Sequence, residues 1–343
     1  MKILTITRPD DWHLHVRNGA VLKTVLPHTA RQFARAIIMP NLKPPVTTVA
    51  QAVAYREEIL QAVSAGGDFT PLMTLYLTGS TTATEIKKAA ESDYVHAFKL
   101  YPAGATTNSD SGVADIRAIY PLIEEMEKYD IPLLIHGEVT DEHCDIFDRE
   151  RVFIETYLTG IVDNFPNLRI VVEHVTTKEA VQFVQATGKN IAATITPQHL
   201  LFNRNAILAG GIRPHYYCLP IIKREHHRLA LVAAATSGNP KFFLGTDSAP
   251  HLTSLKETAC GCAGCYSAHA ALELYAEVFD RAGSLDKLEG FASFFGADFY
   301  RLPRNSGTVT LEKTKWTVPA AYGVNEHAIT PLKANEELNW KMQ

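Results

Sequence analysis

Short apolar runs of strand length alternate along this chain with longer segments of helical spacing. The apolar runs end near eight positions: His13–His15, Met39, Leu77, Lys99, His136, His174, Ile195 and Asp247. A strand followed by a helix, repeated many times, is typical of the βαβ units of a parallel sheet. Eight such units favour a closed (β/α)8 TIM barrel, an α/β fold, over an open sheet.

The segments between the runs have the spacing of amphipathic helices. We expect helices at Val49–Ser64, Ala83–Ser92, Val113–Tyr129, Phe147–Asn164, Thr176–Thr187 and Arg224–Ser237, and less clearly at Val21–Phe33. Beyond the last run, two further helices are expected at Ala268–Ala282 and Leu285–Phe294, followed by a polar C-terminus. No linker or repeat interrupts the pattern, so residues 1–343 are expected to form a single barrel domain with a C-terminal helical extension.

Composition and charge exclude several classes of protein. Hydrophobic residues make up 46% of the chain and charged residues 20%, which is enough for a packed core. The net charge of -4, without a basic run, argues against a nucleic-acid partner. No apolar stretch is long enough to span a membrane, and the N-terminus does not resemble a signal peptide. Five cysteines are an odd number for a disulfide framework, so we expect a cytoplasmic protein.

Reactive side chains stand at the carboxyl ends of the apolar runs. In barrels this end of the strands forms the rim on which active sites are built. Scattered polar residues would not favour one end of so many strands. The residues placed in this way are His13, His15, Lys99, His136, His174 and Asp247.

Each of these residue types can serve at a metal centre. His13 and His15 alternate on one strand, so both point to the same face, roughly 6–7 Å apart. Neutral imidazole suits zinc, although a single histidine after an apolar strand is more often a core residue. Lys99 lies between apolar residues, and an uncharged lysine there can react with carbon dioxide to give a carbamate ligand. Asp247 can bind a metal and move a proton, the alternative being a helix N-cap.

Longer motifs extend this pattern into a resemblance. They are Asp11–Arg17, Met39-Pro40-Asn41, Lys99, His136-Gly137-Glu138, Glu173-His174 and Gly245–His251. Together they resemble the amidohydrolase superfamily, and within it the single-domain bacterial-type dihydroorotases. The resemblance runs over nearly the whole chain, with no departure at a metal-ligand position.

The resemblance implies two zinc ions per subunit, bridged by hydroxide. One zinc would be held by His13, His15, Asp247 and Lys99, the lysine being N6-carboxylysine. The second zinc would be held by Lys99, His136 and His174. Asp247 would also be the catalytic acid and base in the reversible cyclisation of N-carbamoyl-L-aspartate to (S)-dihydroorotate and water.

The resemblance also implies how such a substrate is held. Arg17 and Asn41 would bind its carboxylate, because an arginine fork fits a planar carboxylate in a bidentate manner. His251, and backbone groups at Leu219 and Ala263, would assist. A loop after the fourth strand would close through Thr106 and Thr107, and His15 and His136 would also contact the substrate. Relatives of this kind suggest a homodimer.

Other readings remain open. A hydantoinase or allantoinase could use the same metals without requiring a substrate carboxylate. A non-catalytic scaffold, or a barrel enzyme with unrelated chemistry, is also conceivable. Cys260, Cys262 and Cys265 lack a fourth cysteine at zinc spacing and are read as a glycine-rich loop beside the substrate. Residues off the strand-end pattern are expected at the surface, the rim or behind the ligands: His199, His215, His226, His227, Asn203 and Arg204.

Overall fold

The computed structural model describes residues 2–63 and 67–343, and its centre is an eight-stranded parallel sheet. Neighbouring strands pair in chain order, each parallel to the next. Every predicted run contains one of these strands, and its named end lies in the strand or within three residues after it. The strands are β2 (Asp10–Leu14), β3 (Arg35–Ile38), β4 (Thr70–Leu77), β5 (Val95–Leu100), β6 (Leu133–Ile135), β7 (Ile170–Val172), β8 (Ile191–Ile195) and β9 (Phe242–Leu244).

Backbone hydrogen bonds join the last strand to the first and close the barrel. The chain leaving β9 runs beside β2, where the Asp247 amide donates to the His13 carbonyl at 2.9 Å. The His15 amide donates to the Ser248 carbonyl at 3.1 Å, and Leu14 pairs with Ser248 in parallel. The predicted eight-stranded barrel is therefore confirmed.

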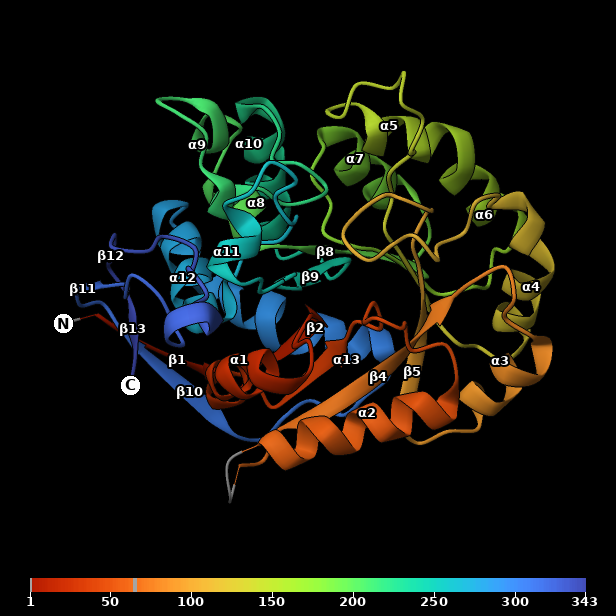
Figure 1. Ribbon diagram of the computed structural model, residues 1–343, viewed down its shortest axis with the longest axis horizontal. Helices are drawn as coiled ribbons and strands as arrows, with labels where there is room; N and C mark the ends of the chain where they lie inside the picture. Colours follow the sequence, from red (N-terminus) through yellow and green to blue (C-terminus); the bar gives the residue numbers. More distant parts are fainter. Residues whose placement is uncertain (1, 64–66) are drawn as a thin grey trace.

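Helices surround this barrel on its outer face (Figure 1). The predicted helices Val49–Ser64, Ala83–Ser92, Thr176–Thr187 and Arg224–Ser237 are confirmed with shorter ends, Ser64 itself lying outside the described residues. The helix that was expected less clearly, at Val21–Phe33, is also present. The helices are α1 (Gly19–Gln32), α2 (Val49–Ala62), α3 (Ala83–Ala90), α4 (Tyr120–Lys128), α5 (Arg149–Phe153), α6 (Thr159–Asn164), α7 (Lys178–Ala186) and α10 (Glu225–Ala235), with short α8 (Pro197–Leu201), α9 (Asn205–Leu208) and α11 (Thr253–Lys256).

Two helix predictions differ in detail from the structure. The helix predicted from Val113 begins only with a 3-10 turn at Arg117–Ile119, because Val113 pairs with Pro102 and ties down the loop after β5. The predicted helix Phe147–Asn164 is helical from Arg149, but a π-helical turn, Ile154–Leu158, separates α5 from α6. The spacing of apolar residues along the chain does not reveal a loop contact or a π-helical turn of this kind.

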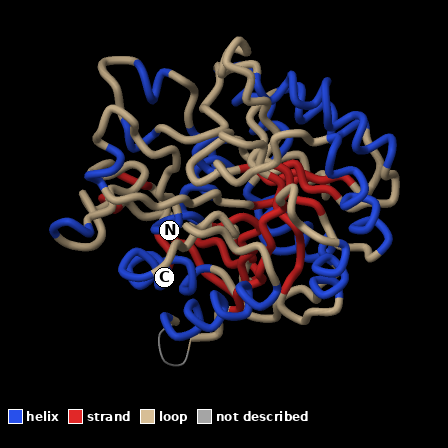
Figure 2. The backbone as a smooth tube through the Cα atoms, turned by 45° about the vertical axis from the view of Figure 1, so that its right-hand side comes forward, coloured by secondary structure: helices blue, strands red, loops and turns tan. Residues whose placement is uncertain are grey.

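The predicted helical extension at the C-terminus is only partly helical. Helix α12 (Ala271–Arg281) corresponds to the predicted Ala268–Ala282, whereas the predicted helix Leu285–Phe294 is only a 3-10 turn at Leu285–Lys287 and a π-helical turn at Gly290–Phe294. Helix α13 (Phe295–Tyr300) follows, and after it come strands β10 (Thr308–Glu312), β11 (Trp316–Thr317), β12 (Glu337–Leu338) and β13 (Lys341–Met342). Strand β10 lies between β1 (Ile3–Thr7) and β13 in an antiparallel sheet outside the barrel. The two ends of the chain consequently lie side by side (Figures 1 and 2). This pairing joins residues about three hundred positions apart, beyond the reach of local pattern reading.

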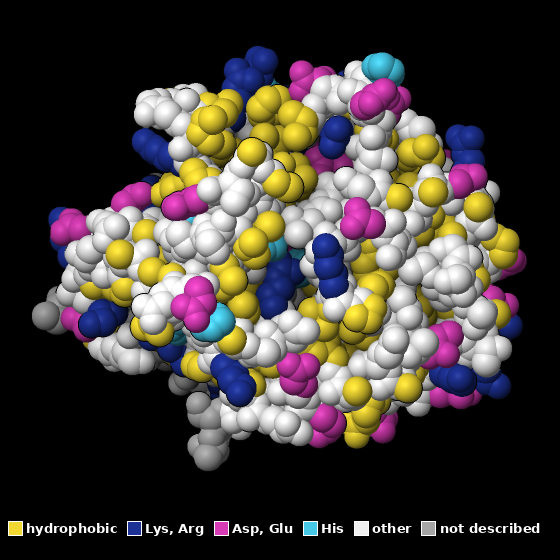
Figure 3. Space-filling model, in the orientation of Figure 1, with side chains coloured by type: hydrophobic (Ala, Val, Ile, Leu, Met, Phe, Trp, Pro, Cys, Tyr) yellow, Lys and Arg dark blue, Asp and Glu magenta, His cyan; other side chains and the backbone are white. Residues whose placement is uncertain are grey.

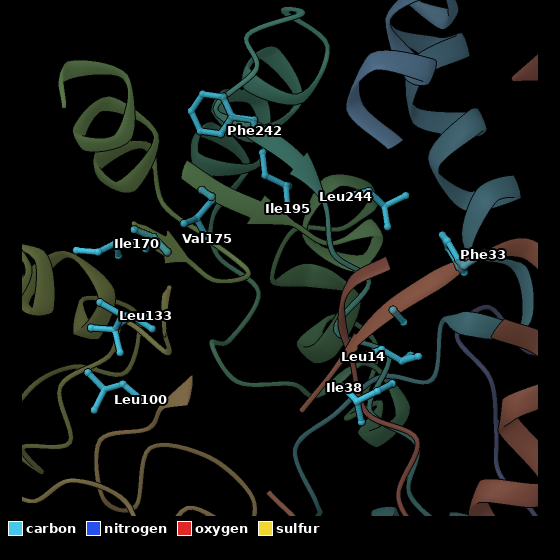
Figure 4. Packing of buried hydrophobic residues seen from close by; sticks show 14 of the residues in the cluster. Leu14, Phe33, Ile38, Leu100, Leu133, Ile170, Val175, Ile195, Phe242 and Leu244 are labelled. Atoms are coloured by element: carbon cyan, nitrogen blue, oxygen red, sulfur yellow. The ribbon is translucent and has the colours of Figure 1, made fainter. Parts of the chain in front are cut away.

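The barrel strands are apolar on both faces, as predicted. Phe242 and Leu244 of β9 point outward to the helices, where they join the larger cluster shown in part in Figure 4. Phe243, between them, belongs to a second cluster with Trp12 and Tyr300, whose rings stack at 4.6 Å. Filled layers of this kind leave the carboxyl ends of the strands as the place for a site. None of the described helices is long and apolar enough to cross a membrane.

Candidate active site

Three of the predicted ligands meet at the junction of the first and last barrel strands. His13 and His15 extend from β2, and Asp247 stands three residues beyond the end of β9. One potential ligand atom of each lies within 4.8 Å of those of the other two, and all three side chains are buried. Asp247 Oδ1 is 3.3 Å from His13 Nε2 and 3.2 Å from His15 Nε2. This group could hold a metal ion.

The other two predicted histidines lie beside this group. His136 directly follows β6, and His174 lies two residues beyond the end of β7. The ring centroids are 4.9 Å apart for His13 and His174, and 4.8 Å apart for His136 and His174. Burial lowers the pKa of His15 to about 3 and that of His174 well below its usual value, so both imidazoles are neutral and able to bind a metal.

Lys99 is buried close to these histidines, with its Nζ 5.1 Å from the centroid of the Tyr101 ring. Its side chain is fully buried, and its Nζ makes no hydrogen bond with any residue that the structure describes. Burial lowers its pKa to about 8, against the attraction of Glu173 and Asp247. Nδ1 of His174 is likewise buried without a partner among the described residues. Orphaned donors of this kind are costly in a folded protein and fit a centre that is completed by bound metal.

Acceptors behind the histidines fix the orientation of their rings. Glu173 Oε2 lies 2.7 Å from His13 Nδ1, and Glu138 Oε2 lies 2.8 Å from His136 Nε2. Asn41 Oδ1 lies 2.8 Å from His15 Nδ1. Such partners hold a ligating ring in place and raise its basicity. The two glutamates are within two residues of ligands in motifs that the sequence displays, yet the sequence assigned them no role.

The backbone at the site is strained. Arg17, His174 and Asp247 have φ values of 59°, 41° and 43°, in the left-handed region that side chains with a Cβ rarely adopt. Buried Asp11 helps to hold this geometry, since it accepts hydrogen bonds from the Thr246 amide at 2.9 Å and the Thr246 hydroxyl at 2.6 Å. Strain maintained by surrounding contacts is typical of functional sites.

Cationic and amide groups lie next to the histidine cluster. Arg17 Nε donates to the Pro250 carbonyl at 3.1 Å, and its Nη2 is 3.1 Å from His251 Nε2. Burial lowers the pKa of His251 to about 2, so its ring is neutral beside the guanidinium. Asn41, on the other side, contacts His15. This side of the pocket therefore offers a positive fork with an amide beside it, a suitable receptor for a carboxylate. Figure 3 shows a recess near the middle of the molecule's face, with Lys or Arg and His atoms visible inside it.

The loop after β5 lies folded over the site. Asn41 Nδ2 donates to the Thr107 carbonyl at 3.2 Å, and the Ala263 amide donates to Thr107 Oγ1 at 3.1 Å. Thr106 and Leu219 line the same pocket. All fourteen lining residues come from loops or strand ends, and they include every predicted site residue except Lys99, which lies below them, and His251, which contacts Arg17.

The residues that the sequence placed off the strand-end pattern do not line the candidate active site. His199 is buried, contrary to a surface position, and its ring is 2.7 Å from Thr196 Oγ1 and 2.9 Å from the Pro220 carbonyl. His215 faces Glu257, and Asn203 lines a different cavity. A further cavity is lined by Arg204, His226 and His227. All five cysteines are free.

A closed parallel barrel with histidine, lysine and aspartate at its strand ends defines a class of protein, and comparison with known proteins gives the same class. Residues 6–318 match the model of the Amidohydrolase family. The chain is 65% identical to a dihydroorotase of Picosynechococcus over 99% of both chains. A dihydroorotase structure from Campylobacter jejuni superimposes with a TM-score of 0.91 at 36% identity, covering 99% of this chain and 97% of the other.

A dihydroorotase from Saccharomyces cerevisiae, solved in complex with 5-fluoroorotic acid, also superimposes with a TM-score of 0.91. The two chains are 33% identical, with 100% of this chain and 99% of the other covered. The chain therefore belongs to the amidohydrolase family and, within that family, to the dihydroorotases.

Proposed function

We propose that this chain catalyses the reversible cyclisation of N-carbamoyl-L-aspartate to (S)-dihydroorotate with loss of water, in the de novo synthesis of pyrimidines. The observation that carries the proposal is the convergence of four imidazoles, one carboxylate and one unpartnered lysine at a single pocket. Full-length identity to dihydroorotases supports the same substrate.

The donor set fits two zinc ions. His13, His15 and Asp247 would hold one, His136 and His174 the other, and Lys99 as N6-carboxylysine would contribute to both. Zinc, when bound, would polarise the ring carbonyl and lower the pKa of attacking water. The buried Lys99 amine, with its pKa lowered to about 8, is uncharged in a larger fraction of molecules than an exposed lysine and so is better able to take up carbon dioxide.

Arg17, Asn41 and His251 would hold the substrate carboxylate. Nη2 of Arg17 is within 3.1 Å of His251, and Asn41 is fixed by His15 and by the Thr107 carbonyl. Because these contacts already fix the side chains of Arg17 and Asn41, substrate binding loses less side-chain conformational entropy. Leu219 and Ala263, which line the same pocket, would add backbone contacts.

Asp247 would move the proton. Its close contacts with His13 and His15 outweigh the effect of burial, so the pKa of Asp247 lies well below its usual value and the group is ionised. A carboxylate at this position would accept the proton of the attacking water and deliver it to the leaving ureido nitrogen. Thr106 and Thr107, on the folded loop, would exclude bulk water during this transfer.

A comparison of substrates tests this function. Zinc-loaded protein should hydrolyse dihydroorotate and cyclise carbamoyl-aspartate, and hydantoins that lack a carboxylate should react much more slowly. Faster turnover of such hydantoins would make the chain a hydantoinase or allantoinase. Metal analysis addresses the scaffold alternative, because a chain that retains well under one zinc would lack the proposed centre.

We propose that the chain forms a homodimer and acts in the cytoplasm on a small-molecule substrate alone. Light scattering coupled to size-exclusion chromatography measures the first directly, and a monomer at micromolar concentration would contradict it.

A further inference from the structure

A second cavity lies away from the active site, between the first helix and the C-terminal strands. It has a volume of about 180 Å³ and is lined by α1, α12, β11, β13 and the segment that holds Tyr322. Figure 1 shows these elements grouped beside the two chain ends. The lining residues are His28, Arg31, His269, Glu273, Trp316, Tyr322 and Lys341.

The floor of this cavity carries polar atoms that the described residues leave unpartnered. His269 is 1% exposed, and neither its Nδ1 nor its Nε2 makes a hydrogen bond. Glu273 is also 1% exposed: its Oε1 accepts from Arg31 and from the Met342 amide, while its Oε2 has no partner. Each such group costs stability unless a bound molecule satisfies it. Three orphaned atoms on one floor therefore indicate a polar ligand.

The His269 ring offers one donor and one acceptor. Burial, followed by the nearby His28 side chain, lowers its pKa to about 3, so the imidazole is neutral. A ligand edge that complements His269 and Glu273 must donate to a carboxylate oxygen and accept from an imidazole N–H at adjacent positions. The N–H and C=O of a cyclic amide present this pair side by side.

The walls are aromatic and held in place. The Trp316 indole donates to the Trp340 carbonyl at 2.7 Å, which fixes the ring. Tyr322 lies with its ring centroid 4.3 Å from that of His28 and 5.7 Å from that of His269. Fixed aromatic surfaces favour a flat ligand, because stacking on them requires little further ordering.

The mouth of the cavity is cationic. The Arg31 side chain is 47% exposed, and Lys341 is exposed on β13. Glu273 provides the one acidic side chain among the lining residues, against these two cations. The excess of one positive charge at the opening suits an anionic group that remains near solvent.

We propose that the cavity floored by His269 and Glu273 is a second ligand site for a planar heterocycle with a cyclic-amide edge and an anionic substituent. Uridine monophosphate (UMP), whose uracil ring has such an edge, belongs to this chemical class. The ring lies between Trp316 and Tyr322 with its amide edge on the floor, and the phosphate lies at Arg31 and Lys341. The site is independent of the proposed reaction, although the segment from Ala263 to His269 connects the two pockets along the chain.

Calorimetric titration of the zinc-loaded full chain with UMP, in the absence of any active-site ligand, tests the site. We expect one saturable site per chain, with uridine and inorganic phosphate each binding more weakly than UMP. Lys341→Ala should weaken UMP binding by about tenfold or more, as expected for loss of a charged contact, and leave uridine binding unchanged. His269→Asn should weaken binding of both.

Matched controls separate this cavity from the active site and from general charge effects. Lys315, an exposed lysine one residue before Trp316, pairs with Glu337, and Lys315→Ala should leave UMP binding unchanged. Arg17→Ala should impair turnover but retain UMP binding. Absence of saturable UMP binding to active wild-type protein would mean that the cavity holds only water. Binding that is lost in Arg17→Ala and kept in Lys341→Ala would place UMP in the active site, and phosphate binding as tight as UMP would exclude recognition of the ring; either result would overturn the proposal.

Discussion

Replacing Lys99 by methionine should stabilise the metal-free protein while abolishing its activity. The ammonium is fully buried and has no hydrogen-bond partner among the described residues. Its pKa falls from 10.5 to about 8 on folding. At about 1.4 kcal/mol for each pH unit between these values, the buried amine costs about 3 kcal/mol at neutral pH. Methionine has a similar length and carries no such cost.

The direction of the pH dependence follows from linkage. Because the pKa of Lys99 is lower in the folded chain than in the unfolded chain, the unfolded chain binds more protons between pH 8 and 10.5. The unfavourable contribution of Lys99 to the stability of the wild-type protein should therefore shrink as the pH rises through this window. The advantage of Lys99→Met should shrink from about 3 kcal/mol near pH 7 to about 1 kcal/mol near pH 10.

Urea unfolding of chelator-treated protein in carbonate-free buffer measures both quantities. Activity of the same variant after zinc loading gives the functional comparison, and Lys99→Ala with added short carboxylic acids tests whether a free carboxylate replaces the carbamate. A methionine variant that is less stable than wild type at pH 7, or an advantage that does not change with pH, would refute this view of Lys99. Full activity of the zinc-loaded variant would remove the residue from the site.

Three other substitutions test separate parts of the argument. Asp247→Asn should keep the fold but lower kcat by about 100-fold or more, because no carboxylate remains to move the proton; near-normal turnover would contradict this role. Arg17→Lys should raise the KM for dihydroorotate by about tenfold, since a lysine cannot form the bidentate fork, and an unchanged KM would place the carboxylate elsewhere. Gly296→Ala should destabilise the chain by about 1–3 kcal/mol in urea unfolding, because the new Cβ would lie 2.0 Å from Trp12 Nε1; unaltered stability would show that the barrel floor can yield there.

The barrel strands could be read from the sequence because their signal is local. Phe242, Phe243 and Leu244 are apolar together, and parallel strands covered on both faces require such runs. The positions of His136 and His174 follow from the same reasoning, since a residue directly after a barrel strand must stand at the rim.

Contacts between distant segments could not be read in this way. Thr7 pairs with Thr308, and neither sequence neighbourhood specifies the other. Glu173 faces His13 across the barrel, a contact that depends on closure and on the positive φ of His174. The orphaned nitrogens of His269 likewise arise only when α12 packs beside the C-terminal strands. Chain topology, rather than residue type, decides these features.

The seam between the first and last barrel strands has a consequence for how the chain matures. His13 is made early in synthesis and Asp247 late, and Asp11 has its Thr246 partner only once both ends are present. A nascent chain that has not yet been made as far as Asp247 thus holds only part of the ligand set, and its Asp11 carboxylate lacks the Thr246 partner. No fragment that ends before Asp247 or begins after His13 contains the complete ligand set, so metal binding by that set would discriminate against such incomplete chains.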